Sequence, residues 1–205
     1  MEITVLGATG ATGRLIVRQA LDRGHTVRAV ARDPSRLPEL AGLRPVAADV
    51  RDPAAIARAL AGAEVILSGL GVASGEAPGV LAAGAGAAAA AAPGRIVWLG
   101  ALGTGRSAAA AGAATRLLLR AFMRRELPDK LAADAAVLAA GGTALHVGPM
   151  ADGPAAPTRR RVAPADVPRR LFPARIARAT VAAAMLDEAE DPLGHRGQTL
   201  VALER

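Results

Sequence analysis

Residues 3–17 of the chain read Ile3-Thr4-Val5-Leu6-Gly7-Ala8-Thr9-Gly10-Ala11-Thr12-Gly13-Arg14-Leu15-Ile16-Val17. The first four residues are typical of a β-strand, and the last residues begin an amphipathic helix. The three glycines between them allow the backbone to turn sharply and to approach a pyrophosphate, at which the helix start aims its amide groups. This order of strand, turn and helix predicts a dinucleotide-binding site, with a purely structural tight turn as the alternative.

The rest of the chain repeats the same alternation of short β-branched runs and Ala-rich segments of helical length. The pattern is typical of βαβ units that build a parallel sheet. We expect strands at 3–6, 26–31, 44–47, 65–67, 95–99, 143–147 and 198–202, and helices at 11–22, 53–60, 79–92, within 113–140, and at 174–188. Asp52 before Pro53 is the expected N-cap of the second helix. The prediction is an α/β fold in which residues 1–205 form one Rossmann-type domain, a doubly wound parallel sheet with helices on both faces.

The composition limits the chemistry that the protein can use. The 205 residues include no cysteine and no tyrosine, with two Phe and one Trp. Disulfides, thiolate zinc sites, cysteine nucleophiles and a phenol acid are therefore excluded. The three histidines show no metal-ligand spacing, so we expect no metal. The net charge of +7 permits anionic partners, but the lack of stacking aromatics argues against nucleic acid.

Arginine-rich segments lie in the second half of the chain. Residues 149–173 are rich in proline and arginine and are predicted to form a lid loop. Arg159-Arg160-Arg161, Arg169-Arg170 and a helical stripe of Arg116, Arg120 and Arg124 are either solvated surface or attract an anionic or flavin-like small molecule. No stretch is apolar enough to predict a membrane span, and the first residues lack a signal-peptide pattern. We therefore expect a cytoplasmic protein without a membrane partner, either a monomer or a homodimer.

Further motifs resemble those of one protein superfamily. The run Gly7 to Arg14 is followed by Gly24-His25-Thr26-Val27 and by Val30-Ala31-Arg32-Asp33-Pro34. Together these residues resemble the atypical short-chain dehydrogenase/reductase superfamily. The nearest relatives in it are NAD(P)H-binding proteins that include NmrA-like sensors and flavin or biliverdin reductase-like enzymes. The resemblance covers essentially the whole chain and implies a cofactor that lies across the carboxyl ends of the strands.

The resemblance also implies which residues contact the cofactor. Asp49 is expected to meet the adenine edge, with a loop acid near the next helix as the alternative. The ammonium of Lys130, the only lysine of the chain, is expected near the nicotinamide ribose, with a helix-surface lysine as the alternative. Apart from Arg32 and Arg36, which are discussed next, the residues expected to contact the cofactor are Gly7, Thr9, Gly10, Ala11, Thr12, Gly13, Asp49, Val50, Ser68, Gly69, Leu70, Gly71, Gly100, Lys130 and Pro149.

Arg32 bears on the choice between the two nicotinamide cofactors. It ends the second predicted strand, where an NAD-specific site would carry an acid for the ribose 2′-hydroxyl. A guanidinium there instead suits a 2′-phosphate, and Arg36 and Arg14 are close enough in sequence to join it. The sequence therefore favours NADP(H), with three surface arginines as the alternative.

The chain departs from the superfamily pattern at the catalytic positions. The usual tyrosine is absent, and Gly100-Ala101 stands where relatives carry serines. Gly148 stands where relatives commonly carry an arginine. Lys130 remains as a candidate catalytic residue, and His146 could replace the lost phenol as proton donor, with a satisfied core histidine as the alternative.

Two functions from different classes fit these residues. The first is an NADPH-dependent reductase that delivers hydride to a flavin, quinone or other conjugated small molecule, for which no tyrosine acid is needed. The second is a non-catalytic NADP(H)-binding redox sensor or regulator of the NmrA-like kind. The fold alone does not distinguish them.

Overall fold

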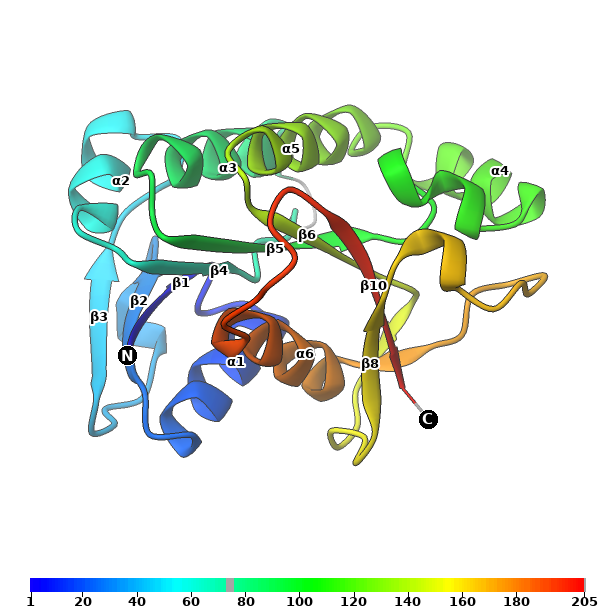
Figure 1. The fold of residues 1–205 in the computed structure, drawn as a ribbon. Helices are drawn as coiled ribbons and strands as arrows, with labels where there is room; N and C mark the ends of the chain where they lie inside the picture. The colour runs from blue at the N-terminus through cyan, green and yellow to red at the C-terminus, as the bar shows by residue number, and fades with distance from the viewer. Residues whose placement is uncertain (73–75, 205) are drawn as a thin grey trace.

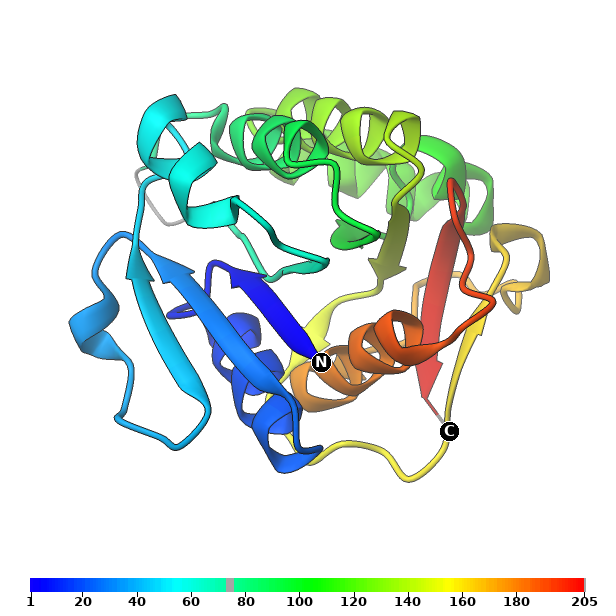
Figure 2. The same ribbon diagram turned by 60° about the vertical axis from the view of Figure 1, so that its left-hand side comes forward.

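The computed structural model describes residues 1–72 and 76–204 (Figures 1 and 2). Its centre is an eight-stranded sheet of order β3-β2-β1-β4-β5-β6-β10-β8. The strands are β1 Glu2–Leu6, β2 Thr26–Ala31, β3 Leu43–Ala47, β4 Val65–Ser68, β5 Arg95–Ala101, β6 Thr143–Val147, β8 Arg159–Val162 and β10 Thr199–Glu204. Every neighbouring pair is parallel except β10 with β8. The strand order reverses between β1 and β4, and ligands of such sheets bind beyond the carboxyl ends at this point.

Helices cover both faces of the sheet (Figure 1). On one face lie α1 Ala11–Asp22 and α6 Arg178–Glu190, and on the other lie α2 Pro53–Leu60, α3 Val80–Ala90 and α5 Leu127–Ala139. Each face has its own apolar core cluster. The central strands β4 and β6 are buried along their whole length, because both of their faces are covered. The predicted single-domain Rossmann-type fold is confirmed.

Most predicted elements are found at or near their predicted bounds. Both α1 and α2 have the predicted ends, and Asp52 caps α2 by accepting hydrogen bonds from the amides of Ala54 and Ala55. The long helix predicted within 113–140 is instead two helices, α4 Ala113–Phe122 and α5. Pro128 lies in the first turn of α5, where its missing amide costs nothing, whereas inside a longer helix it would remove a hydrogen bond.

The segment 149–173, predicted to be a loop without regular elements, contains two strands. β7 Met150–Ala151 pairs with β9 Ile176–Ala177, and β8 pairs antiparallel with β10 at the edge of the sheet. The loop prediction was therefore wrong for these residues. A run of three arginines has no apolar alternation, and its strand conformation depends on ion pairs with α6 that a local pattern does not show. No helix within the described ranges is long and apolar enough to cross a bilayer.

Candidate functional site

A cavity of about 600 Å³ lies beyond the carboxyl ends of the strands, at the point where the strand order reverses between β1 and β4. We call it the turn cavity, because the turn after β1 forms one of its walls. Twelve residues predicted to contact a cofactor line it: Gly7, Thr9, Gly10, Ala11, Thr12, Arg32, Arg36, Asp49, Val50, Gly69, Leu70 and Gly71. The sequence analysis missed several others, among them Glu76, Leu99, Met150 and Arg178. Glu76 lies in the loop after β4, Leu99 in β5, Met150 in β7 and Arg178 at the start of α6, and only the fold brings these separate segments to the turn.

The glycines of the turn have different structural roles. Gly7 has a φ of +70°, and a Cβ there would lie 3.0 Å from the backbone of Leu70. A Cβ at Gly13 would lie 2.1 Å from the carbonyl oxygen of Gly7, so this glycine lets α1 pack directly on the turn. A Cβ at Gly10 would meet the Gly7 oxygen at 3.2 Å. Gly10 lines the turn cavity, whereas Gly13 is buried behind it.

The first turn of α1 fits a pyrophosphate. Gly10 is its N-cap, and no side chain of the described residues caps the helix start, where no acidic residue lies. The first amides of a helix have no intrahelical partner, and they carry a partial positive charge. Since Gly10, Ala11 and Thr12 line the turn cavity, its wall offers donors and a favourable dipole to an anion.

One end of the turn cavity is rich in charge. The guanidinium of Arg32 lies 2.7 Å from a carboxylate oxygen of Glu76, and Arg51 lies 3.5 Å from the same oxygen. Arg36 also lines the turn cavity, while Arg14 is not among the lining residues and donates instead to the carbonyl of Arg36 at 3.2 Å. Two guanidinium groups thus lie near one carboxylate, and Arg36 adds a third positive charge to the residues that line the turn cavity.

The remaining predicted contact residues do not line the turn cavity. Ser68 is buried and accepts a hydrogen bond from the amide of Leu70 at 3.3 Å. The carbonyl of Pro149 accepts from the amide of Ile176 and joins β7 to β9. Lys130 lies half-buried on α5 beside Asp129, whose carboxylate caps α3. Lys130 does not line the turn cavity, and it is its neighbour Asp129 whose side chain points to α3, so the expected contact of Lys130 with the nicotinamide ribose stays a prediction.

His146 is enclosed by protein and lines neither this cavity nor the second one described below. Its ring is 1% exposed, and Nδ1 lies 2.7 Å from Oγ of Ser107. Nε2 lies 3.0 Å from a carboxylate oxygen of Asp134, without the angles of a hydrogen bond. The expectation of a proton donor that faces the substrate is therefore not met, and the alternative of a core histidine describes the contacts.

Gly100 explains why His146 fits there. The two residues are paired in register on β5 and β6. A Cβ at Gly100 would lie 2.4 Å from Cδ2 and 2.6 Å from Nε2 of the His146 ring. The imidazole therefore occupies the space that a side chain at position 100 would need. Gly100 makes room for His146 and does not line the turn cavity.

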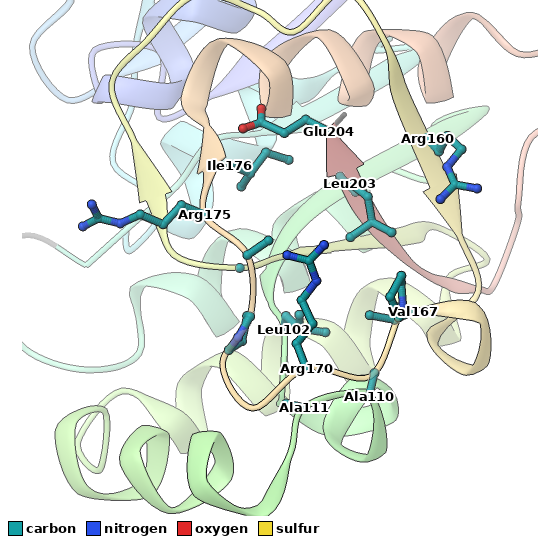
Figure 3. Close-up of a pocket in the computed structure, with 15 residues that line it drawn as sticks. Leu102, Ala110, Ala111, Arg160, Val167, Arg170, Arg175, Ile176, Leu203 and Glu204 are labelled. Atoms are coloured by element: carbon teal, nitrogen blue, oxygen red, sulfur yellow. The ribbon is translucent and has the colours of Figure 1, made fainter.

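A second cavity of about 280 Å³ lies beyond the carboxyl ends of β5, β6 and β10 (Figure 3). We call it the arginine cavity, because Arg160, Arg170 and Arg175 line it together with Leu102, Gly148, Ile176, Leu203 and Glu204. The paired strands β7 and β9 separate it from the turn cavity. Met150 lines the turn cavity, and its register partner Ile176 lines the arginine cavity. Two cavities thus share one edge of the sheet on either side of a two-stranded ribbon.

The arginines of the predicted lid divide between two environments. Arg159 and Arg161 face α6, where Arg159 pairs with Asp187 at 2.6 Å and Arg161 with Glu188 at 2.9 Å. Burial alone would raise the pKa of Asp187, but its hydrogen bonds and ion pairs with Arg159 and Arg23 hold this pKa below its usual value. Arg160 and Arg170 instead line the arginine cavity. Arg116 donates to the carbonyl of Ala108, and the side chain of Arg120 lies outside the described residues.

Among the residues that the structure describes, one group of side chains has atoms close enough together to hold a metal ion. Glu188, Asp191 and His195 have atoms within 4.8 Å of one another. Arg161 already lies 2.9 Å from Glu188 and 3.2 Å from Asp191, and His195 lies 3.1 Å from Glu188. The guanidinium thus supplies the positive charge at the place where a cation would bind.

Two curated proteins are similar to short segments of the chain. A 69-residue segment, 33% of the chain, is 41% identical to the photosystem II assembly factor Ycf39 of Cyanophora paradoxa. A 67-residue segment, 32% of the chain, is 40% identical to an uncharacterized protein of Mycobacterium tuberculosis strain H37Rv. The matches span 22% of the first protein and 8% of the second.

Solved structures are similar over the whole chain. The anaerobillin reductase ChuY of Escherichia coli O157:H7 has a TM-score of 0.78 at 23% identity. The match covers 100% of this chain and 97% of that one. A candidate NADH-flavin reductase of Streptococcus pneumoniae TIGR4 has a TM-score of 0.79 at 18% identity, with full coverage of both chains. A short-chain dehydrogenase/reductase of Veillonella parvula in complex with NADP has a TM-score of 0.80 at 16% identity, over 99% of this chain and 94% of that one. At these identities the likeness is one of fold.

The family comparison covers most of the chain. Residues 7–192 match the model of a family described as NAD(P)H-binding, from the first glycine of the turn to beyond the end of α6. The resemblance drawn from the sequence motifs is thereby confirmed, and the uncapped start of α1 beside the glycines gives it a physical basis. The chain therefore belongs to the NAD(P)H-binding family.

Proposed function

We propose that the protein is an NADPH-dependent reductase that delivers hydride to a flavin, quinone or other conjugated small molecule. The observation that carries the proposal is the pair of cavities on either side of the β7–β9 ribbon. The turn cavity would hold the cofactor, and the arginine cavity would hold the acceptor. The nicotinamide supplies the hydride when bound, and the residues of the chain bind and orient the two partners.

The side chains at hand favour acceptors that need no acid. The chain has no tyrosine, and the one histidine near the carboxyl ends of β5 and β6, His146, is enclosed by Ser107, Gly100 and Asp134. A ketone needs a proton as its oxygen becomes a strongly basic alkoxide, whereas a reduced flavin or quinone is a stabilised anion that takes its proton from water. The proposal therefore assigns no general acid.

The expected acceptor range provides the test of this function. Purified protein with NADPH should reduce flavins and quinones well above the rate in buffer, and simple ketones and aldehydes poorly or not at all. NADPH oxidation measured with a panel of these compounds decides it. Fast reduction of an ordinary ketone would show that an acid has been missed. Tight NADPH binding with no turnover of any acceptor would favour the alternative, a redox sensor without catalysis, which the enclosure of His146 also permits.

The proposed preference for NADPH rests on Arg32, with Arg36 and Arg51 nearby. A charge-assisted contact to a 2′-phosphate contributes about 1.5–3 kcal/mol, and about 1.4 kcal/mol corresponds to a factor of ten. We expect NADPH to bind at least about tenfold more tightly than NADH, and Arg32→Ala to remove most of that ratio. Titration calorimetry with both cofactors measures it, and equal affinities in the unmodified protein would contradict the proposal.

Glu76 should oppose this preference. Its carboxylate holds Arg32 at 2.7 Å and would repel a 2′-phosphate. Glu76→Gln keeps the shape and removes the charge, so NADPH affinity should rise several-fold while NADH affinity changes little. Glu39→Gln, an exposed substitution outside both cavities, is the matched control. A fall in the NADPH to NADH ratio in Glu76→Gln would show that Glu76 helps to bind the phosphate end.

A further inference from the structure

The side chains that line the arginine cavity carry more positive than negative charge, and an uncharged acceptor would not interact with this excess. Arg160, Arg170 and Arg175 line it, and the only acid among its lining residues is Glu204. An oxygen of Glu204 already accepts a hydrogen bond from the amide of Ala177 at 3.1 Å. The cavity therefore has an excess of positive charge, beside the apolar side chains of Leu102, Ile176 and Leu203.

The backbone pattern separates Arg160 from its neighbours. Successive residues of a strand point to opposite faces, so Arg159 and Arg161 reach the acids of α6 while Arg160 points away from them. Arg160 is paired in register with Leu203 of β10, which also lines the arginine cavity. Of the three arginines in β8, only Arg160 lines the arginine cavity.

Arg170 approaches the same space from the opposite wall. Figure 3 shows its side chain extending from the loop after η3 (Pro164–Asp166) into the middle of the cavity, toward Ile176 and Leu203. In the same view Arg160 stands at the β8 side, and Arg175 turns outward. The loop that carries Arg170 is attached to α4 through the hydroxyl of Thr115, which donates to the carbonyl of Leu171 at 3.3 Å.

We propose that the arginine cavity binds an oxyanion, a phosphate or carboxylate, on the acceptor molecule through Arg170 and Arg160. Guanidinium groups suit such oxygens in charge and shape. Since β8 is the strand farthest from the turn cavity in this half of the sheet, the anion would lie at the outer end. The conjugated ring would lie inward, against Leu102 and Gly148 and next to the ribbon. This inference rests on the proposed reductase function and specifies the substrate class for it.

FMN and riboflavin provide a matched pair of probes, because they share one ring system and differ by a phosphate. We expect FMN to bind at least about tenfold more tightly than riboflavin, and this ratio to fall toward one in Arg170→Ala and in Arg160→Ala. Arg169→Ala, which changes an exposed neighbour outside the cavity, should keep the ratio. Added salt should weaken FMN binding and leave riboflavin binding unchanged, since the arginines are exposed. A carboxylate-bearing quinone compared with its neutral parent distinguishes a general oxyanion site from one that is specific for phosphate.

The readout is binding of the flavin to the protein by titration calorimetry, with turnover measured in parallel. Equal binding of FMN and riboflavin, or an unchanged ratio in both arginine variants, overturns the oxyanion site even if both flavins are reduced. Selective FMN binding without turnover keeps the site and rejects the reductase function. The two proposals therefore fail through different results.

Discussion

Gly10→Val is expected to abolish binding of NADPH and NADH while the protein stays folded. Gly10 lines the turn cavity at the start of α1, where the added methyl groups would occupy the space of the pyrophosphate. We expect a loss of at least about a hundredfold in affinity, which corresponds to about 2.7 kcal/mol. Titration calorimetry measures the affinity, and circular dichroism checks the fold.

The control for this substitution is Gly86→Val. Gly86 is an exposed residue of α3, and a Cβ there would meet nothing within 4 Å. This variant carries the same chemical change at a residue that does not line the turn cavity, and it should bind cofactor as the unmodified protein does. Retained affinity in a folded Gly10→Val variant would mean that the glycine-rich turn is only structural.

Gly100→Ser, which restores the residue type of the superfamily pattern, is expected to destabilise the protein instead of improving catalysis. The new Cβ would lie 2.4 Å from the His146 ring and 3.2 Å from a carboxylate oxygen of Asp134. Overpacking of this kind costs about 1–3 kcal/mol, and we expect the upper end because the ring is enclosed on all sides. Urea unfolding gives the change in the free energy of unfolding.

A double-mutant cycle isolates the cause. His146→Ala alone should destabilise, because it leaves a cavity and removes the contact with Ser107. In the double variant Gly100→Ser/His146→Ala the new serine can occupy the space of the missing ring. The double variant should therefore lose about 1–3 kcal/mol less free energy of unfolding than the sum of the two single variants. Strict additivity would show that the pair on β5 and β6 is not in steric competition.

The same pair shows what sequence reasoning could reach and what it could not. Glycine at position 100 and the missing tyrosine are both visible in the sequence, which indicates only that the usual catalytic groups are lost. The imidazole that fills the space beside Gly100 belongs to His146, which lies 46 positions later and is in register with Gly100 on the next strand. Only the pairing of the two strands brings them together, so a local motif cannot show that they meet.

The turn cavity was predictable to a larger extent, because its residues follow strand ends in a repeated pattern. Gly7, Gly10 and Arg32 come directly after β1 and β2, and the carboxyl ends of parallel strands meet at one edge. Glu76 comes from a loop after β4 with no motif of its own, so its ion pair with Arg32 was not predicted. For Arg160 and Arg170 the sequence leaves open whether they are solvated surface or attract an anion, and it does not predict the arginine cavity that they line.

The place of Lys130 outside the lining of the turn cavity could not be predicted from the sequence either. Its position on the helix depends on where the predicted long helix breaks and on which side α5 turns to its neighbour. Asp129 fixes that side by capping α3 through the amides of Leu81 and Ala82. Asp129 follows Leu81 and Ala82 by 48 and 47 positions in the sequence. Local sequence spacing cannot predict a helix cap between residues so far apart.

The most direct test of the reductase proposal is a single-turnover measurement. The protein is first saturated with NADPH, or with NADPH deuterated at the transferred position, and is then mixed with FMN or a quinone. We predict that bound NADPH is oxidised faster than free NADPH, that deuteration slows this step, and that Gly10→Val removes the acceleration. Bound NADPH that is not oxidised by any acceptor faster than in buffer would contradict the reductase proposal.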